Sequence, residues 1–145
     1  MMSLDLLPAA IASVAALIDL RSRRIPNWLT LAAVLAGLAW HTLRDGPTGL
    51  SVALAGAALG LALLLPFYMV RGVGAGDVKL LAAIGALVGP QTLVSVAIYG
   101  ALVGGAISLV LLARSRLQMR GMTAPYGVAI ASGVYLSMLL PSVIG

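Results

Sequence analysis

Two aspartates lie at the edges of apolar segments, where a charged carboxylate is costly, so the presence of each one needs a physical explanation. Asp19 closes the first apolar stretch, in Ala-Leu-Ile-Asp-Leu, and Asp77 opens a later one, in Gly-Ala-Gly-Asp-Val-Lys-Leu. A charge at the centre of a membrane helix costs about 2.5–3.5 kcal/mol even on lenient scales. Two facing carboxylates can hydrolyse a peptide bond, because the ionised one takes a proton from water while the protonated one donates to the scissile carbonyl. Such a pair should share one proton and titrate as a unit.

The remaining side chains disfavour other kinds of hydrolytic site. The chain has no Cys, a single His, and four acidic residues that are all Asp. A cysteine nucleophile is therefore impossible, and ligands for a zinc peptidase are scarce. The one histidine, His41, falls near the opposite membrane face from both aspartates, which argues against Ser/His/Asp chemistry. We expect water to be the nucleophile, with no metal or other cofactor.

The composition predicts that lipid is the solvent for much of the surface. Of 145 residues, 61% are hydrophobic and 9% charged, and the mean hydropathy is +1.10. One small core cannot hide so much apolar surface. The net charge of +5 comes from basic residues in short loops, where they meet anionic lipid headgroups more naturally than nucleic acid. We therefore expect membrane lipid, and no nucleic acid, as a partner.

Six apolar segments are candidates for membrane-spanning helices, each of which needs about 20 residues, with a lower limit near 17. The fourth is short unless it continues through Gly89 and Pro90, a pair that is typical of either a tight turn or a kink. The first lacks a basic start, so we expect it to be retained. The chain then forms one membrane-embedded domain, residues 1–145. The six apolar segments cover about residues 3–20, 28–43, 48–70, 77–88, 91–113 and 124–144.

The basic residues distinguish between a turn and a kink at Pro90. With a turn, every Lys and Arg except Arg44 lies in loops on one side. The positive-inside rule makes that side cytoplasmic. We therefore predict an all-α, polytopic bundle of six transmembrane helices with both termini on the non-cytoplasmic side. Because the first helix runs inward and the fourth outward, Asp19 and Asp77 reach the same cytoplasmic edge.

Glycine spacing suggests where helices approach closely. Pairs of glycines four residues apart let helix backbones come together in lipid, although such pairs also arise by chance in a Gly-rich chain. The glycines around Gly74 and Gly76 can take φ > 0 and let a substrate backbone lie beside a catalytic acid, or they form only a flexible connector. The pairs of glycines four residues apart are Gly56/Gly60, Gly85/Gly89 and Gly100/Gly104.

Simpler roles for the charged residues stay open. Asp19 could pair with Arg21 or Arg23, and Asp77 could cap the fourth helix through the first free N–H groups. Lys79 either holds substrate backbone near the aspartates or anchors the helix at the headgroups. A non-enzymatic transporter or assembly component would use these aspartates for proton relay or ion pairing.

Three stretches together resemble the type IV prepilin peptidases, the membrane aspartic peptidases with a Gly-x-Gly-Asp motif. The motif itself is similar to Gly74-Ala75-Gly76-Asp77, followed by Val-Lys-Leu-Leu. Asp19 with the loop Arg24-Ile25-Pro26-Asn27 resembles the family's first catalytic aspartate and the segment after it. Ala124-Pro125-Tyr126-Gly127 is similar to the family's Pro-Tyr/Phe-Gly-Pro stretch, although Val128 replaces the second proline.

The resemblance implies an aspartic endopeptidase of the inner membrane. It implies that Asp19 and Asp77 are catalytic, that Gly74, Gly76 and Lys79 position the substrate, and that the leader of a prepilin or pseudopilin is cut on the cytoplasmic side, just before the substrate's hydrophobic helix. The family's bifunctional members carry an N-terminal region with paired cysteines that this sequence lacks. The chain therefore looks like the short peptidases of tight-adherence (Flp-type) pilus systems, which cleave without methylating.

Overall fold

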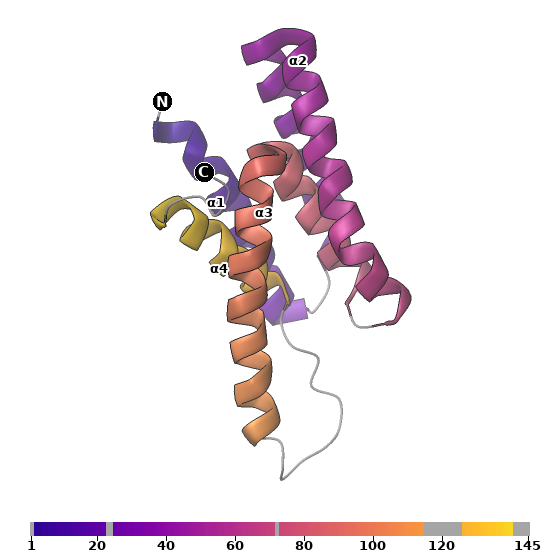
Figure 1. Cartoon of the computed structure of the whole chain (residues 1–145), viewed down its shortest axis with the longest axis vertical. Helices are drawn as coiled ribbons and strands as arrows, with labels where there is room; N and C mark the ends of the chain where they lie inside the picture. Colours follow the sequence, from indigo (N-terminus) through magenta and orange to yellow (C-terminus); the bar gives the residue numbers. More distant parts are fainter. Residues whose placement is uncertain (1, 23–24, 72, 115–125, 141–145) are drawn as a thin grey trace.

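The structure is a computed structural model that describes residues 2–22, 25–71, 73–114 and 126–140. Nearly all of these residues belong to four helices (Figure 1). The predicted all-α class is therefore confirmed for the part of the chain that the structure describes. The helices are α1 (Met2–Ser22), α2 (Asn27–Met69), α3 (Ala75–Arg114) and α4 (Tyr126–Leu139).

The two long helices are each interrupted by a glycine. In α2, Gly46 has φ 61° and ψ −139°, and in α3, Gly89 has φ 81° and ψ 169°. Glycine takes these angles without a Cβ penalty, and the proline after each of them cannot donate a backbone hydrogen bond across the break. The chain doubles back at both points, so each long helix has two halves that run in opposite directions (Figure 1). At Gly89 and Pro90 the chain thus turns, as the charge pattern predicts.

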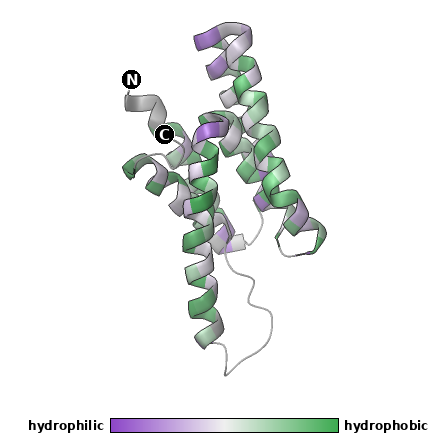
Figure 2. Cartoon of the chain, in the orientation of Figure 1, coloured by the Kyte–Doolittle hydropathy of each residue, from purple (hydrophilic) through white to green (hydrophobic). Residues whose placement is uncertain are grey.

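Apolar side chains face outward as well as inward. Leu31, Leu102 and Leu109 are 61%, 66% and 70% exposed. Hydrophilic residues gather where α2 and α3 double back, and apolar residues cover much of the helices between (Figure 2). The stretches Asn27–Met69 and Ala75–Leu111 are long and apolar enough to cross a membrane, whereas the apolar parts of α1 and α4 are shorter.

Glycines hold α2 and α3 together at close range. A Cβ on Gly56 would overlap the carbonyl of Gly85, and a Cβ on Gly85 would overlap the carbonyl of Gly56. In the same way, Gly60 lies against the backbone of Leu81 and Ala82. The prediction that these glycines let helix backbones approach is confirmed, because no larger residue would fit at the crossing.

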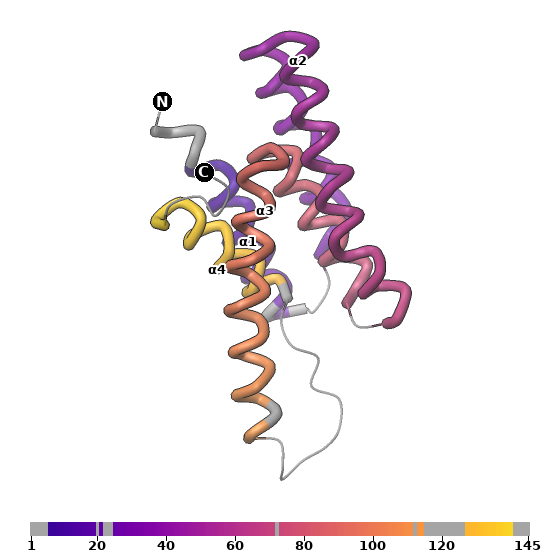
Figure 3. The backbone as a smooth tube through the Cα atoms, viewed as in Figure 1, coloured from indigo at the N-terminus to yellow at the C-terminus, as the bar shows by residue number. Residues whose placement is uncertain are grey.

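The fourth helix closes the bundle. It packs against α3 and α1, so the first and last described helices are neighbours in space (Figure 3). Gly100 and Gly104 of α3 lie against Ala129 of α4. The core beneath is fully buried and apolar; its largest members are Leu80, Ile84, Leu93, Val96 and Val134.

His41 has a structural role that the sequence did not suggest. The interruption at Gly89 ends the regular hydrogen-bond ladder of the first half of α3. The nearby carbonyl of Leu87 accepts a hydrogen bond from Nε2 of His41, at 3.0 Å. An unpaired carbonyl is costly away from water, so this bond across the α2–α3 contact stabilises the turn.

Candidate active site

Asp77 lies in the first turn of α3, where the helix dipole favours a negative charge. Its backbone N–H donates to the carbonyl of Gly74 at 3.1 Å, and its Oδ2 accepts the N–H of Gly74 at 3.2 Å. This reciprocal pair is a helix-capping arrangement. The capping role considered for Asp77 is therefore confirmed at Gly74. It uses only Oδ2, so the second oxygen is left for other chemistry.

Asp19 lies close to the end of α1, but its hydrogen-bond donor comes from α4. Its Oδ2 accepts the backbone N–H of Gly127, the second residue of α4, at 3.1 Å. The N–H groups of a helix N-terminus and the positive end of its dipole suit an anionic partner. Each aspartate is thus held through Oδ2 by a backbone N–H at the start of a helix.

Gly127 can hold Asp19 this closely because it has no side chain. A Cβ there would lie 2.9 Å from Oδ2 of Asp19 and 3.0 Å from its Cβ, both well inside ordinary contact. Sequence reasoning noticed the Pro-Tyr-Gly stretch only as part of a resemblance. A glycine inside the first turn of a helix, where it has a low helix propensity, is the signal that could have pointed to a close backbone approach.

The structure brings Asp19 and Asp77 together from separate helices. Their carboxylates are close enough to interact electrostatically, and both residues are half-buried. Of the alternative partners considered for Asp19, Arg21 is exposed, and Arg23 lies outside the described residues.

The described glycines before Asp77 do not use the positive φ that glycine can take. Gly74 and Gly76 both have ordinary φ values, and Gly72 lies outside the described residues. A Cβ on Gly76 would be 3.2 Å from the Cβ of Ile25, and a Cβ on Gly74 would be 3.3 Å from Oδ2 of Asp77. Gly74 is exposed, and its N–H is the donor to Asp77. The absence of a side chain at these positions therefore permits close packing on Ile25 and on the Asp77 carboxylate.

Lys79 is exposed and contacts the start of α2. Its Nζ donates to Oδ1 of Asn27 at 3.0 Å, and Asn27 is the first residue of that helix. The contact ties α2 to the end of α3 that carries Asp77. An ammonium has three donors, so two remain for another acceptor. No group of three His, Cys, Asp or Glu side chains that could hold a metal ion occurs in the described residues.

Comparison with known proteins places these residues in a wider context. The model of the type IV leader peptidase family matches residues 6–109. A prepilin leader peptidase/N-methyltransferase of Burkholderia pseudomallei strain 1026b is 35% identical over 131 residues, which cover 86% of this chain and 42% of that protein. A prepilin leader peptidase/N-methyltransferase of Aeromonas hydrophila is 34% identical, with 84% of this chain and 44% of that protein covered. The chain thus spans less than half the length of these relatives, and no solved structure matches it.

Proposed function

Because the chain belongs to the type IV leader peptidase family, we propose that it is an aspartic endopeptidase that removes the leader peptide of prepilin-like proteins. The observation that carries the proposal is the pairing of Asp19 with Asp77, which lie on different helices and interact electrostatically. A capping role accounts for Asp77 alone. It gives no reason for a second carboxylate beside it.

The two carboxylates would act as one acid and one base on a water molecule between them. The ionised carboxylate takes a proton from the water, and the oxygen of that water forms a bond to the scissile carbonyl carbon. The protonated carboxyl donates its proton to the carbonyl oxygen, which gives a neutral tetrahedral intermediate. The C–N bond then breaks as the amine takes the proton that the first carboxylate received, and a proton returns from the diol to the second. Protons balance over the cycle, and the dyad ends as it began.

Hydrogen bonds to the backbone keep this dyad in position. The N–H groups of Gly127 and Gly74 each hold one Oδ2, so both side chains have a fixed orientation on rigid helices. The other oxygen of each carboxyl group is then available for water and substrate. Fixed orientation of reacting groups is worth several kcal/mol of barrier, which is why loose carboxylates would not suffice.

Substrate-positioning roles are proposed for Gly74, Gly76 and Lys79. Gly74 is exposed beside Asp77, so an extended peptide can come close to its backbone. Gly76 lets the start of α3 lie directly on Ile25, which sets the position of the dyad relative to α2. The Lys79 ammonium can donate to a substrate carbonyl while it keeps its bond to Asn27.

We propose that the whole chain, residues 1–145, is one membrane-embedded domain with six spans, both termini on the non-cytoplasmic side and the dyad at the cytoplasmic face of the inner membrane. The doubling back of α2 and α3 supports six spans, since it divides two long helices into four apolar halves. The basic residues support the orientation, because all except Arg44 would lie on the cytoplasmic side. Lipid would then be the solvent for the exposed leucines.

Co-expression with candidate prepilins tests the function. Wild type should shorten one of them by its leader, seen as a gel shift, with the new N-terminus identified by mass spectrometry. Asp19→Asn and Asp77→Asn should abolish the shift, since each removes the acid–base character of one partner. Asp45→Asn is the matched control, because Asp45 is an exposed aspartate at the turn of α2.

Two outcomes contradict the proposal. The two-aspartate mechanism would be ruled out if prepilin processing survived either Asp19→Asn or Asp77→Asn in membranes that contain the variant protein. Wild type that cleaves no prepilin would favour a non-enzymatic membrane protein, in which the aspartates relay protons or form ion pairs.

A further inference from the structure

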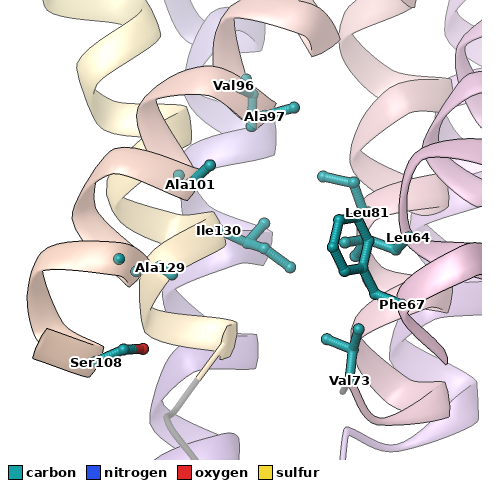
Figure 4. Close-up of a pocket in the computed structure, with 13 residues that line it drawn as sticks. Leu64, Phe67, Val73, Leu81, Val96, Ala97, Ala101, Ser108, Ala129 and Ile130 are labelled. Atoms are coloured by element: carbon teal, nitrogen blue, oxygen red, sulfur yellow. The ribbon is translucent and has the colours of Figure 1, made fainter. Parts of the chain in front are cut away.

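An apolar groove of about 300 Å³ opens between α2, α3 and α4. Figure 4 shows its two walls facing each other across the open space. Apart from Ser108, its lining is wholly apolar, so a ligand that enters it must be apolar as well. One wall carries Leu64, Phe67 and Leu81 from α2 and α3, and the other carries Ala97, Ala101 and Ile130 from α3 and α4.

Two residues that line the groove lie one helical turn from residues of the candidate active site. Leu81 follows Asp77 by four residues on α3, and Ile130 follows Gly127 by three on α4. Residues three or four apart lie on the same face of a helix, about 5.4 Å along its axis. Both walls therefore begin one helical turn from the groups that hold the two carboxylates. A peptide chain whose scissile bond lies between the aspartates has the near end of the groove directly beside it.

The wall formed by the second half of α3 is built to admit a helix. Gly105 lines the groove, and a Cβ added there would meet nothing within 4 Å. Ala101 lines the same wall, whereas Gly100 and Gly104, which also line it, pack against Ala129 of α4. Small residues let a second helix come close in lipid, where packing rather than hydrophobicity drives association. Inside a bilayer a peptide must satisfy its own backbone groups, so the segment that occupies the groove is helical.

We propose that the groove binds the apolar helix of the substrate that continues from the cleaved bond, and that it thereby selects membrane-anchored substrates over soluble peptides. The inference rests on the proposed peptidase function and goes further by assigning the binding surface. A lipid chain could fill an apolar groove too, and so could a helix of a second copy. Only the substrate is covalently continuous with the bond that lies between the aspartates, which is why the helix of the substrate is the occupant.

Filling the groove from within tests the proposal. Gly105→Leu adds a side chain at a groove position where a Cβ meets nothing within 4 Å. Ala106→Leu adds the same side chain at the next position, which is exposed and does not line the groove. The probes are a prepilin that wild type cleaves and a soluble peptide with the same leader and cut site but no apolar helix. Gly105→Leu should raise KM for the prepilin about tenfold or more while cleavage of the soluble peptide stays unchanged. Ala106→Leu should match wild type on both.

A photo-crosslinking residue at position 105, in the Asp77→Asn background, gives an independent measurement. It should form an adduct with the apolar helix of the uncleaved prepilin. An adduct only with lipid, or only with a second copy of the chain, would overturn the proposal. So would a Gly105→Leu variant that cleaves the prepilin with the KM of wild type. Failure of the peptidase function is a separate result, since there wild type itself cleaves no prepilin.

Discussion

Replacing Gly127 by alanine should slow cleavage sharply while leaving the chain folded. The new Cβ would lie 2.9 Å from Oδ2 of Asp19, whereas ordinary contact begins at 3.4 Å. Either the start of α4 or the carboxyl group must therefore move by on the order of half an ångström, and the hydrogen bond from the Gly127 N–H lengthens or breaks. Gly127 has no positive φ, so alanine fits the backbone itself.

The expected fall in kcat follows from the free energy that the hydrogen bond from Gly127 to Asp19 contributes. A hydrogen bond to a charged group contributes about 1.5–3 kcal/mol. Since about 1.4 kcal/mol corresponds to a factor of ten, loss of that bond lowers kcat roughly 10- to 100-fold if it holds the carboxyl in its reactive position. A misplacement of about 1 Å can cost about 100-fold by itself. We therefore expect kcat to fall by one to two orders of magnitude, with KM nearly unchanged because Gly127 does not line the substrate groove.

The assay is cleavage by purified protein in liposomes, with a prepilin that wild type processes, measured over a range of substrate concentrations. Ser132→Ala is the matched control, because it also changes one small residue on α4 and removes only a hydroxyl bonded to the Val128 carbonyl. Thermal unfolding of each variant separates loss of the dyad from loss of the fold. A folded Gly127→Ala variant with the kcat of wild type, or one that changes only KM, would refute the role of this amide.

Three further changes test particular contacts. Gly85→Ala should lower the free energy of unfolding by about 1–3 kcal/mol, because the new methyl group overlaps the α2 backbone. Gly105→Ala is the control and should not lower it. Equal thermal midpoints for the two variants would contradict the close approach of α2 and α3 at Gly85. His41→Ala should destabilise the chain by about 1–3 kcal/mol, because it leaves the Leu87 carbonyl unpaired. His41→Gln keeps a donor and should recover part of the lost stability. An equal loss of stability in both variants, measured by thermal unfolding, would argue against the hydrogen bond. Lys79→Met should raise KM several-fold with kcat within about twofold in the liposome assay, and a fall in kcat alone would place the ammonium in the chemistry instead of in binding.

Local sequence was enough to predict the helices and their breaks. Apolar runs bounded by glycine, proline and charge predict helices with ends near Leu20, Trp28, Val70 and Asp77, and the described helices begin or end within a few residues of these positions. The turn at Gly89 followed from charge balance, and the close approach at Gly56 and Gly85 from their spacing. Apart from that turn, which required the basic residues of the whole chain, these features depend on φ/ψ preference and hydropathy, which a short window of sequence contains.

Contacts between distant helices could not be obtained in this way. Nothing in a single sequence says how far α4 rotates about its axis, so the amide of Gly127 could not be assigned to Asp19. The same holds for the bond from His41 to the Leu87 carbonyl. The contact of Gly76 with Ile25 could not be predicted either, because it depends on a neighbour in the fold and not on a dihedral angle.

The sequence by itself determined that this chain is apolar and helical, where its helices break, and which two carboxylates stand at helix ends. Only the tertiary structure decided that the start of α4 supplies the donor for Asp19, and that an apolar groove begins one turn from residues of the site. The division has a physical cause. Helix formation and termination are set by neighbours within a few residues, whereas the rotation and separation of packed helices are set by the fit of all their surfaces at once.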